Sequence, residues 1–277
     1  MLKDFLMKKL KLSRRTIIDL KKNYGTCING KPQKVDTLLK MGDRITLLFP
    51  EAEDSTVPPQ KLELDIVYED AYLIVVNKPA NMPVHPCRNY PEGTLANGLM
   101  FRFKESDSRA TIHPVTRLDK DTSGLTLFAK DPHVQHLLNL EEYKDQFKKE
   151  YIALIEGAIE PGDGLIDLPI ERLEEGKVRR GVVEGGAPSR TEYRTVLRKE
   201  AYSVLEIVLH TGRTHQIRVH FSHLGHPLLG DELYGGKPDL IGRQALHARK
   251  LTLMHPITDE LLVLEAELPE DMKRLVE

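Results

Sequence analysis

The sequence predicts an α+β fold, and two observations support this class. Short runs rich in Ile and Val and bounded by turn residues, such as 65–68 and 73–77, are typical of strands. Helices are interspersed among them, the clearest over 132–143, where Asp131 is the expected N-cap and a proline takes the first helical position. Strands and helices do not alternate regularly, which argues against a doubly wound parallel sheet.

Length and charge predict two domains. The chain has 277 residues and 40% hydrophobic content, enough for one small and one medium core. Residues 1–50 contain nine Lys and three Arg against four Asp, a balance of +8, so the other 227 residues carry −10 when the total is −2. Residues 51–60, with two prolines and no hydrophobic period, are the predicted linker, and 61–277 form the second domain.

The first domain is predicted to contain a short helical pair followed by small strands. Ser13 is the expected N-cap of a helix over 14–23, and Gly25 is its C-terminal stop. Asn29-Gly30 is typical of a type I′ hairpin turn, because both central residues of this turn need a positive φ. The expected strands span residues 26–29, 31–35 and 44–49.

One face of the predicted helix over 14–23 is cationic. Its members are spaced about two turns apart and are here called the basic stripe: Arg14, Arg15, Lys21 and Lys22. Ile17 and Leu20 can face a core from the same helix. A basic module attached to an acidic one predicts that the first domain binds a polyanion, since neutralised phosphates supply most non-specific nucleic-acid affinity.

Two short segments of the first domain, Leu-Ser-Arg-Arg at 12–15 and Ile-Asn-Gly-Lys at 28–31, resemble the RNA-binding domain first named for ribosomal protein S-four. The resemblance covers 1–50 and implies RNA contacts from Lys11, Ser13, Lys31 and the basic stripe. The alternative is a solvated basic helix on a structural appendage.

Composition and absent motifs exclude several classes of protein. The sequence has no run of about 18 uncharged apolar residues and no signal-peptide pattern, so we expect a cytoplasmic protein with no membrane partner. Cys27 and Cys87 alone cannot build a disulfide framework or a paired-cysteine zinc site. A phosphate-binding loop, a Rossmann glycine fingerprint and a Gly-x-Ser-x-Gly elbow are also missing.

The most informative segment is 117–124, Arg-Leu-Asp-Lys-Asp-Thr-Ser-Gly, which precedes the buried strand pattern of 125–129. Asp, Thr, Ser and Gly bond locally to the backbone or tolerate positive φ, so the chain can reverse there without help from packing. Asp119 is therefore held on a tight polar turn, and its carboxylate is a candidate for chemistry.

Together with Lys-Glu-Tyr-Ile-Ala at 149–153 and Thr-Gly-Arg-Thr-His-Gln-Ile-Arg at 211–218, this segment resembles the signature of RluA-type pseudouridine synthases. The likeness runs from about residue 62 to 264 and includes Gly-Asp-Glu-Leu-Tyr-Gly at 230–235. It implies a mixed, largely antiparallel sheet crossed by an RNA-binding cleft. One departure is visible, because many members have histidine directly before Arg-Leu-Asp, whereas this chain has Thr116, with His113 three residues earlier.

The resemblance implies an enzyme that isomerises uridine in RNA to pseudouridine. The reaction exchanges the bond from ribose to nitrogen 1 of uracil for one to carbon 5, and it needs no cofactor. Asp119 is the implied catalytic carboxylate, whether it attacks the sugar, attacks the ring or stabilises an oxocarbenium-like species. The supporting residues have separate implied roles: Arg218 pairs with the aspartate, Tyr151 stacks on the target base, Arg117 enters the gap that the extruded base leaves, and Ile217 supports the site. Thr214 is the expected N-cap of the helix that carries Arg218.

Two other functions stay open at this stage. The chain could be an RNA-binding protein whose synthase domain is inactive, although the complete set of Asp119, Tyr151 and Arg218 argues against this. A metal-dependent hydrolase could use the histidine cluster His210, His215, His220, His223 and His226. Their spacing lacks the i, i+4 pair typical of a helical metal site, so we expect no metal. Large-subunit ribosomal RNA is the favoured substrate and transfer RNA a possible one, with no obligatory protein partner evident and a monomer as default.

Overall fold

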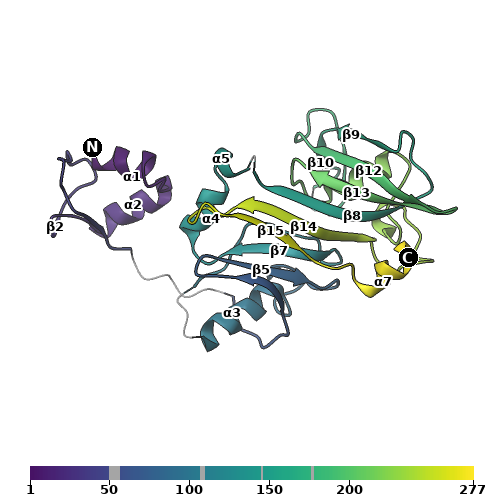
Figure 1. Cartoon of the computed structure of the whole chain (residues 1–277), viewed down its shortest axis with the longest axis horizontal. Helices are drawn as coiled ribbons and strands as arrows, with labels where there is room; N and C mark the ends of the chain where they lie inside the picture. The colour runs from purple at the N-terminus through teal and green to yellow at the C-terminus, as the bar shows by residue number, and fades with distance from the viewer. Residues whose placement is uncertain (50–56, 107–109, 145, 176–177) are drawn as a thin grey trace.

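The computed structural model of the chain describes residues 1–49, 57–106, 110–144, 146–175 and 178–277. The predicted α+β class is confirmed, since helices and strands are mixed and one large sheet dominates (Figure 1). The small N-terminal unit lies beside the end of this sheet that carries the helices α4 (Pro132–Leu138) and α5 (Glu141–Lys144).

The N-terminal unit has the expected helical pair and small strands. Ser13 caps the second helix, since its side-chain oxygen accepts a hydrogen bond from the Thr16 backbone N–H at 3.0 Å. Asn29 and Gly30 have φ of 52° and 77°, which confirms the type I′ turn. The elements are α1 (Leu2–Lys8), α2 (Arg14–Lys22), β1 (Thr26–Ile28), β2 (Lys31–Pro32) and β3 (Ile45–Leu47), and the three strands pair in the order β2-β1-β3.

The core of this unit uses the face of α2 that the sequence predicted. Ile17 and Leu20 are buried and pack against Leu2, Leu6 and Ile28. The four cations of the basic stripe are exposed to solvent. Burial of the apolar face therefore fixes where the charges point.

The predicted linker is only partly described, because 51–56 lie outside the described residues. Its last residues are bonded to the second unit near the start of α3 (Leu95–Glu105). Asn97 donates to the Pro58 carbonyl at 2.7 Å, and the Gln60 backbone N–H donates to the Asn97 carbonyl at 3.0 Å. Residues 58 and 60 are thus anchored to α3, and the domain boundary stays a prediction.

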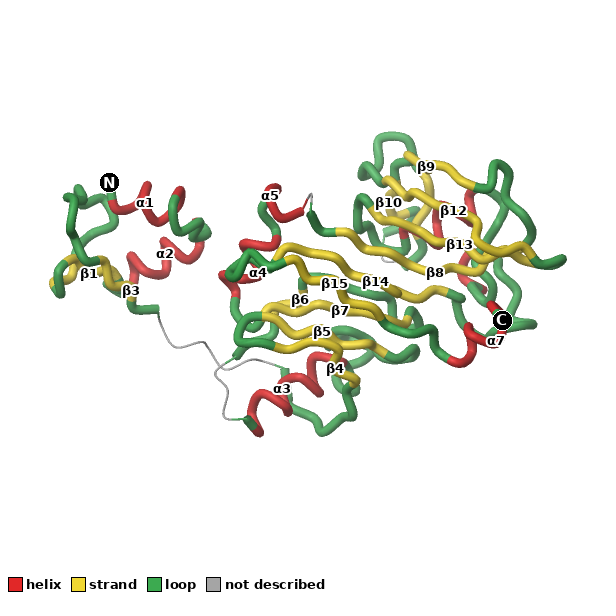
Figure 2. The backbone as a smooth tube through the Cα atoms, in the orientation of Figure 1, coloured by secondary structure: helices red, strands yellow, loops and turns green. Residues whose placement is uncertain are grey.

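Ten strands of the described residues form the large sheet, which Figure 2 shows crossing the second unit. The main order is β4-β5-β7-β14-β8-β13-β12-β9, with β6 against β7 and β15 against β14. All pairs are antiparallel except β14 with β7, as the resemblance implied. The strands are β4 (Asp65–Glu69), β5 (Leu73–Lys78), β6 (His113–Pro114), β7 (Ser123–Ala129), β8 (Lys148–Glu156), β9 (Asp163–Asp167), β12 (Arg190–Arg198), β13 (Tyr202–Leu209), β14 (Leu246–Met254) and β15 (Leu261–Glu265).

Both faces of the sheet are covered along β5 and β7. Ile74 and Val76 pack under α3, whereas Leu73 and Val75 pack under α4, so the run is apolar without alternation. Farther along, α6 (Gln216–His223) covers the face formed by β8, β12 and β13, and α7 (Glu270–Val276) packs on the opposite face. The hairpin β10 (Ile170–Arg172) and β11 (Arg180–Val182) packs against α6.

The predicted helix over 132–143 is interrupted. Asp131 caps it as expected and accepts backbone hydrogen bonds from His133 and Val134 at 2.8 and 3.0 Å. The helix ends at Leu138, because the Asn139 side chain donates to the Gln135 carbonyl and closes the last turn. A separate short helix, α5, follows.

Candidate active site

Asp119 lies on a loop that a buried lysine holds in place. The Lys78 ammonium is fully buried and donates to the carbonyls of Pro79, Met82 and Lys120 at 2.8, 2.8 and 2.9 Å. Burial lowers the pKa of Lys78 to about 7, although the nearby charges of Asp121 and Asp119 oppose the change. The turn that the sequence predicted is closed by the Thr122 N–H, which donates to the Asp119 carbonyl at 3.1 Å.

Gly124 brings this loop close to the neighbouring strand. Its φ is 109°, and a Cβ there would collide with the backbone of Ala248 on β14. Only a glycine lets β7 approach β14 at this parallel junction, where Gly124 is in register with Ala248. The close approach fixes the start of β7, directly after the loop that carries Asp119, against β14.

Arg218 on α6 forms a buried charge cluster with two aspartates. Its Nη1 donates to Asp119 Oδ2 at 2.9 Å, and its Nε and Nη2 donate to the two oxygens of Asp231 at 2.7 and 2.8 Å. Burial alone would lower the pKa of Arg218, but the bonds to Asp231 and the charge of Asp119 raise it above its ordinary value. The guanidinium stays charged and holds one carboxylate oxygen in place.

The start of α6 differs from the prediction. Thr214 was expected to cap it, but the helix begins after His215, whose backbone is left-handed with φ of 58°. The Gln216 side chain instead accepts from the Arg213 N–H at 3.0 Å and from the Thr211 hydroxyl at 2.8 Å. This buried glutamine ties the preceding loop to the helix and sets its entry angle.

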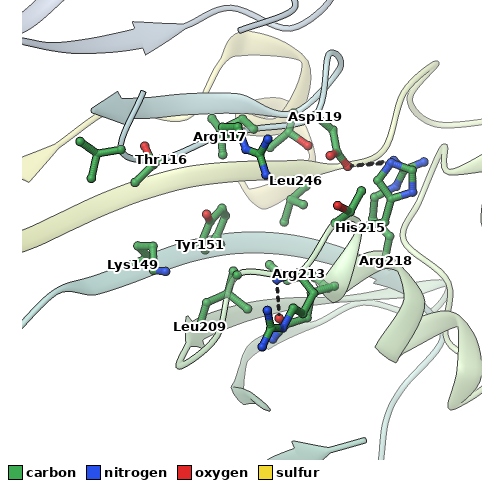
Figure 3. A pocket seen from close by; sticks show the side chains of 17 residues that line it. Thr116, Arg117, Asp119, Lys149, Tyr151, Leu209, Arg213, His215, Arg218 and Leu246 are labelled. Carbon is green, nitrogen blue, oxygen red and sulfur yellow. Dashed lines mark hydrogen bonds and ion pairs between the residues drawn. The ribbon is translucent and has the colours of Figure 1, made fainter. Parts of the chain in front are cut away.

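A cavity of about 440 Å³ opens beside Asp119, within the size range of small-molecule sites (Figure 3). Tyr151 from β8 and Ile217 from α6 line it and are almost fully buried. Burial raises the pKa of Tyr151, and the negative charge of Asp119 raises it further, so its hydroxyl stays protonated at neutral pH. The structure thus brings Asp119, Arg117, Tyr151, Ile217 and Arg218 around one cavity.

Three further cations line the cavity. Arg117 and Arg213 are exposed at the cavity, and Lys149 lies two residues before Tyr151 on the same strand. Burial lowers the pKa of Lys149 from its ordinary value. Arg218 and these three side chains carry four positive charges against the two negative charges of Asp119 and Asp231. The excess of positive charge suits a phosphate-bearing ligand.

Sequence reasoning missed three residues of the site. Asp231 holds Arg218, the Tyr234 ring lies 5.0 Å from the Arg218 guanidinium, and His215 Nε2 lies 3.7 Å from Asp119 Oδ2. All three stand in segments that the family resemblance already quoted, 211–218 and 230–235. A buried aspartate and an aromatic residue in one motif were a usable indication, but their partners lie too far away in the chain to be inferred locally.

Four of the five histidines have separate partners rather than a common centre. Among residues placed by the structure, no group of three or more His, Cys, Asp or Glu side chains is arranged to hold a metal ion. The recorded partners are Glu192 for His210, Tyr234 for His215, Thr191 for His220 and Glu156 for His226.

Thr116 and His113, at the departure from the family pattern, have local partners. The buried Thr116 hydroxyl accepts a hydrogen bond from the Leu127 backbone N–H at 2.8 Å. His113 Nε2 contacts the Thr111 hydroxyl at 2.7 Å. Thr116 therefore ties the start of the loop that carries Asp119 to β7.

The residues expected to bind RNA in the N-terminal unit fall into two groups. Lys31 and the basic stripe are exposed to solvent. Lys11 instead forms an ion pair with Glu142 of α5, and the Ser13 hydroxyl is occupied by Thr16.

In the parts of the chain described above, no helix is long and apolar enough to cross a membrane.

Several known proteins are similar to this chain. Residues 72–223 match the family model described as RNA pseudouridylate synthase. The chain is 41% identical to an uncharacterized RNA pseudouridine synthase, YhcT, of Bacillus subtilis, over 96% of this chain and 89% of that protein. It is 38% identical to the ribosomal large subunit pseudouridine synthase D of Haemophilus ducreyi, over 94% and 82%. The solved structure of human RNA pseudouridylate synthase domain containing 4 is similar, with a TM-score of 0.61 and 27% identity over 76% of this chain and 90% of that one.

Proposed function

The chain belongs to the RNA pseudouridylate synthase family and is an RNA pseudouridine synthase, and from this premise we propose that it modifies large-subunit ribosomal RNA with Asp119 as its catalytic carboxylate. The single observation that carries the proposal is the contact of Arg218 with Asp119 at 2.9 Å on the wall of the cavity. It supports a carboxylate that is ionised, oriented and open to a ligand.

Asp119 has the properties that this isomerisation needs. The reaction must break the bond from ribose to nitrogen 1 and form a bond from ribose to carbon 5 within one site. An ionised carboxylate can attack or stabilise the electron-deficient centre that forms between these two events. The side chain of Asp119 is 25% exposed, so it can reach the substrate while Arg218, only 8% exposed, holds it from behind.

The cavity fits an extruded uridine. Tyr151 offers a ring for stacking, and extrusion of a base costs a few kcal/mol that such contacts must offset. Arg117, exposed and two residues before Asp119, can fill the gap in the RNA stack with its planar guanidinium. Lys149 and Arg213 are placed to receive the phosphates that flank the target nucleotide.

Two observations favour ribosomal over transfer RNA. Relatives at 38 and 39% identity are named for the ribosomal large subunit. The N-terminal unit also presents an exposed basic stripe that suits a long phosphate backbone, as expected of a domain of the S-four type. The cytoplasmic location expected from the sequence belongs to the same proposal.

Tritium release from RNA labelled at carbon 5 of uridine tests the proposal, because formation of the new carbon bond expels that hydrogen. Large-subunit ribosomal RNA and transfer RNA should be compared as substrates for wild type, Asp119→Asn and Asp121→Asn. Asp121 lies on the same turn but does not line the cavity, so it is the matched control. We expect release from ribosomal RNA by wild type and Asp121→Asn, and none by Asp119→Asn, with RNA binding kept.

Each other result has a distinct meaning. Turnover by Asp119→Asn would remove Asp119 as the essential carboxylate. Tritium release from transfer RNA alone would overturn the proposed ribosomal RNA substrate, but it would still support the proposed reaction. If wild type released no tritium from either RNA despite tight binding, the protein would be an inactive RNA-binding protein.

A further inference from the structure

We infer that His215 is a positioning residue for Asp119, and that the Tyr234 hydroxyl fixes which of its two ring nitrogens carries the proton. The inference rests on the proposed catalytic role of Asp119. It concerns three elements that meet at the site: the left-handed residue before α6, the turn at 230–235 and the hairpin of β10 and β11.

The hydrogen bonds around Tyr234 allow only one arrangement of protons. The Arg180 backbone N–H of β11 donates to the Tyr234 hydroxyl oxygen at 3.0 Å. The same oxygen lies 2.8 Å from His215 Nδ1. If Nδ1 carried a proton, the oxygen would accept twice and its own hydrogen would have no acceptor among the described residues. Tyr234 is buried, so an unpaired hydroxyl there would be costly.

The Tyr234 hydroxyl therefore donates to His215 Nδ1, and Nε2 carries the imidazole proton. Burial lowers the pKa of His215, with Arg218 and Arg180 acting in the same direction and Asp119 and Asp231 opposing them. The ring is thus neutral near pH 7 and has one N–H, which faces Asp119 Oδ2 at 3.7 Å. Catalytic contacts are often longer before the substrate binds and shorten in the complex.

This geometry separates the two oxygens of Asp119. Arg218 Nη1 and His215 Nε2 both approach Oδ2, from different elements. In the described part of the chain no partner is recorded for Oδ1. His215 and Arg218 hold one oxygen of Asp119 and leave the other for the ribose or the uracil ring. The three side chains are labelled in Figure 3.

The backbone conformation of His215 also supports its proposed positioning role. Its φ of 58° is unfavourable for a residue with a side chain, and such conformations persist where the surroundings impose them. The Tyr234 hydroxyl and ring supply that constraint, since the two rings meet edge to face with centroids 5.6 Å apart. The hairpin thereby reaches the catalytic carboxylate through Arg180, Tyr234 and His215.

Nitrogen-15 NMR of the ring nitrogens tests the assignment without any substrate. The His215 signals are identified by their loss in His215→Gln. We expect the Nε2–H form in wild type at pH 7.5 and also in Asp119→Asn, because Tyr234 rather than the carboxylate sets the tautomer. Tyr234→Phe, which keeps the ring over Arg218, should give a mixture of both tautomers.

Single-turnover rates with saturating RNA supply the second measurement. Tyr234→Phe and His215→Asn should slow the step by about 10- to 100-fold, as expected when a reacting group is slightly misplaced, and RNA affinity should change little. Asn tolerates the left-handed backbone but lacks a donor at the Nε2 position. His215→Gln, whose amide nitrogen can reach that position, should recover part of the rate.

Two results would overturn the inference. One is an Nδ1–H tautomer in wild type. The other is a Tyr234→Phe protein that keeps both the Nε2–H tautomer and the full rate. A failure of the proposed function is distinguishable from either, because it appears as turnover by Asp119→Asn while the tautomer of wild type is unaffected.

Discussion

The cations of the N-terminal unit and those of the candidate active site are used in opposite ways. Arg14 and Arg15 are exposed and free to meet a phosphate backbone. Arg218 and Lys78 are buried, and each is surrounded by oxygen acceptors within the protein. An exposed charge attracts a polyanion over a distance, whereas a buried and fully paired charge fixes the position of another group. The same residue types are therefore exposed to solvent in one region and fix the position of neighbouring groups in the other.

Removal of the buried charge should have the largest effect. Arg218→Ala leaves Asp119 and Asp231 without their shared partner, so we expect the free energy of unfolding to fall by about 3–5 kcal/mol and turnover to be lost. Urea denaturation and tritium release measure the two effects. Arg194→Ala is the matched control, because the Arg194 side chain is 70% exposed and its pair with Glu206 should contribute little to stability. Equal losses of stability in the two variants would contradict the distinction between buried and exposed arginines.

Lys78 predicts a pH dependence that no exposed cation should show. Its folded pKa of about 7 lies below the ordinary value, so the unfolded chain binds one proton more between pH 7 and about 10. Stability must then rise with pH across this window, by at most about 1.4 kcal/mol per pH unit from this group. Urea denaturation from pH 7 to 10 should show the rise in wild type and a smaller one in Lys78→Met. Parallel curves for the two proteins would contradict a buried titrating lysine.

Reversal of two charges of the basic stripe should weaken RNA binding without changing the rate of the reaction. Arg14→Glu with Arg15→Glu should weaken RNA affinity and flatten its dependence on salt, because fewer counterions are released. The single-turnover rate at saturating RNA should stay unchanged. Lys34→Glu with Lys40→Glu changes the net charge equally at exposed positions off the stripe. If this control weakened binding as much, net charge rather than the stripe would explain the affinity.

The smallest effect is expected at Lys11. Its ammonium pairs with Glu142, and the side chains of the two residues are 37% and 51% exposed. Lys11→Ala should therefore reduce RNA affinity less than Arg14→Ala, and a double-mutant cycle with Glu142→Gln should give a coupling below about 1 kcal/mol. A larger loss of affinity for Lys11→Ala would move Lys11 into the RNA-binding group.

Local sequence predicted the elements whose causes are local. Ser13 and Asp131 are caps because their side chains bond to backbone groups two or three residues away. Asn29-Gly30 turns as expected because its preference for positive φ is intrinsic. The expectation failed at 214, because the Gln216 side chain rather than Thr214 bonds to the loop before α6. It also failed at 139, where the Asn139 side chain bonds back to the Gln135 carbonyl and α4 ends.

The site itself was predicted only as far as its motifs extend. The sequence by itself determined the α+β class, the basic N-terminal surface and the candidate carboxylate, since each follows from composition, periodicity or a contiguous motif. The family resemblance implied the pairing of Arg218 with Asp119, 99 residues earlier. Only the tertiary structure decided that the same guanidinium also binds Asp231 and that His215 contacts Tyr234. The physical reason is that a local pattern fixes backbone conformation within a few residues, whereas a buried charge finds its partner only when packing of the sheet and α6 brings distant segments together.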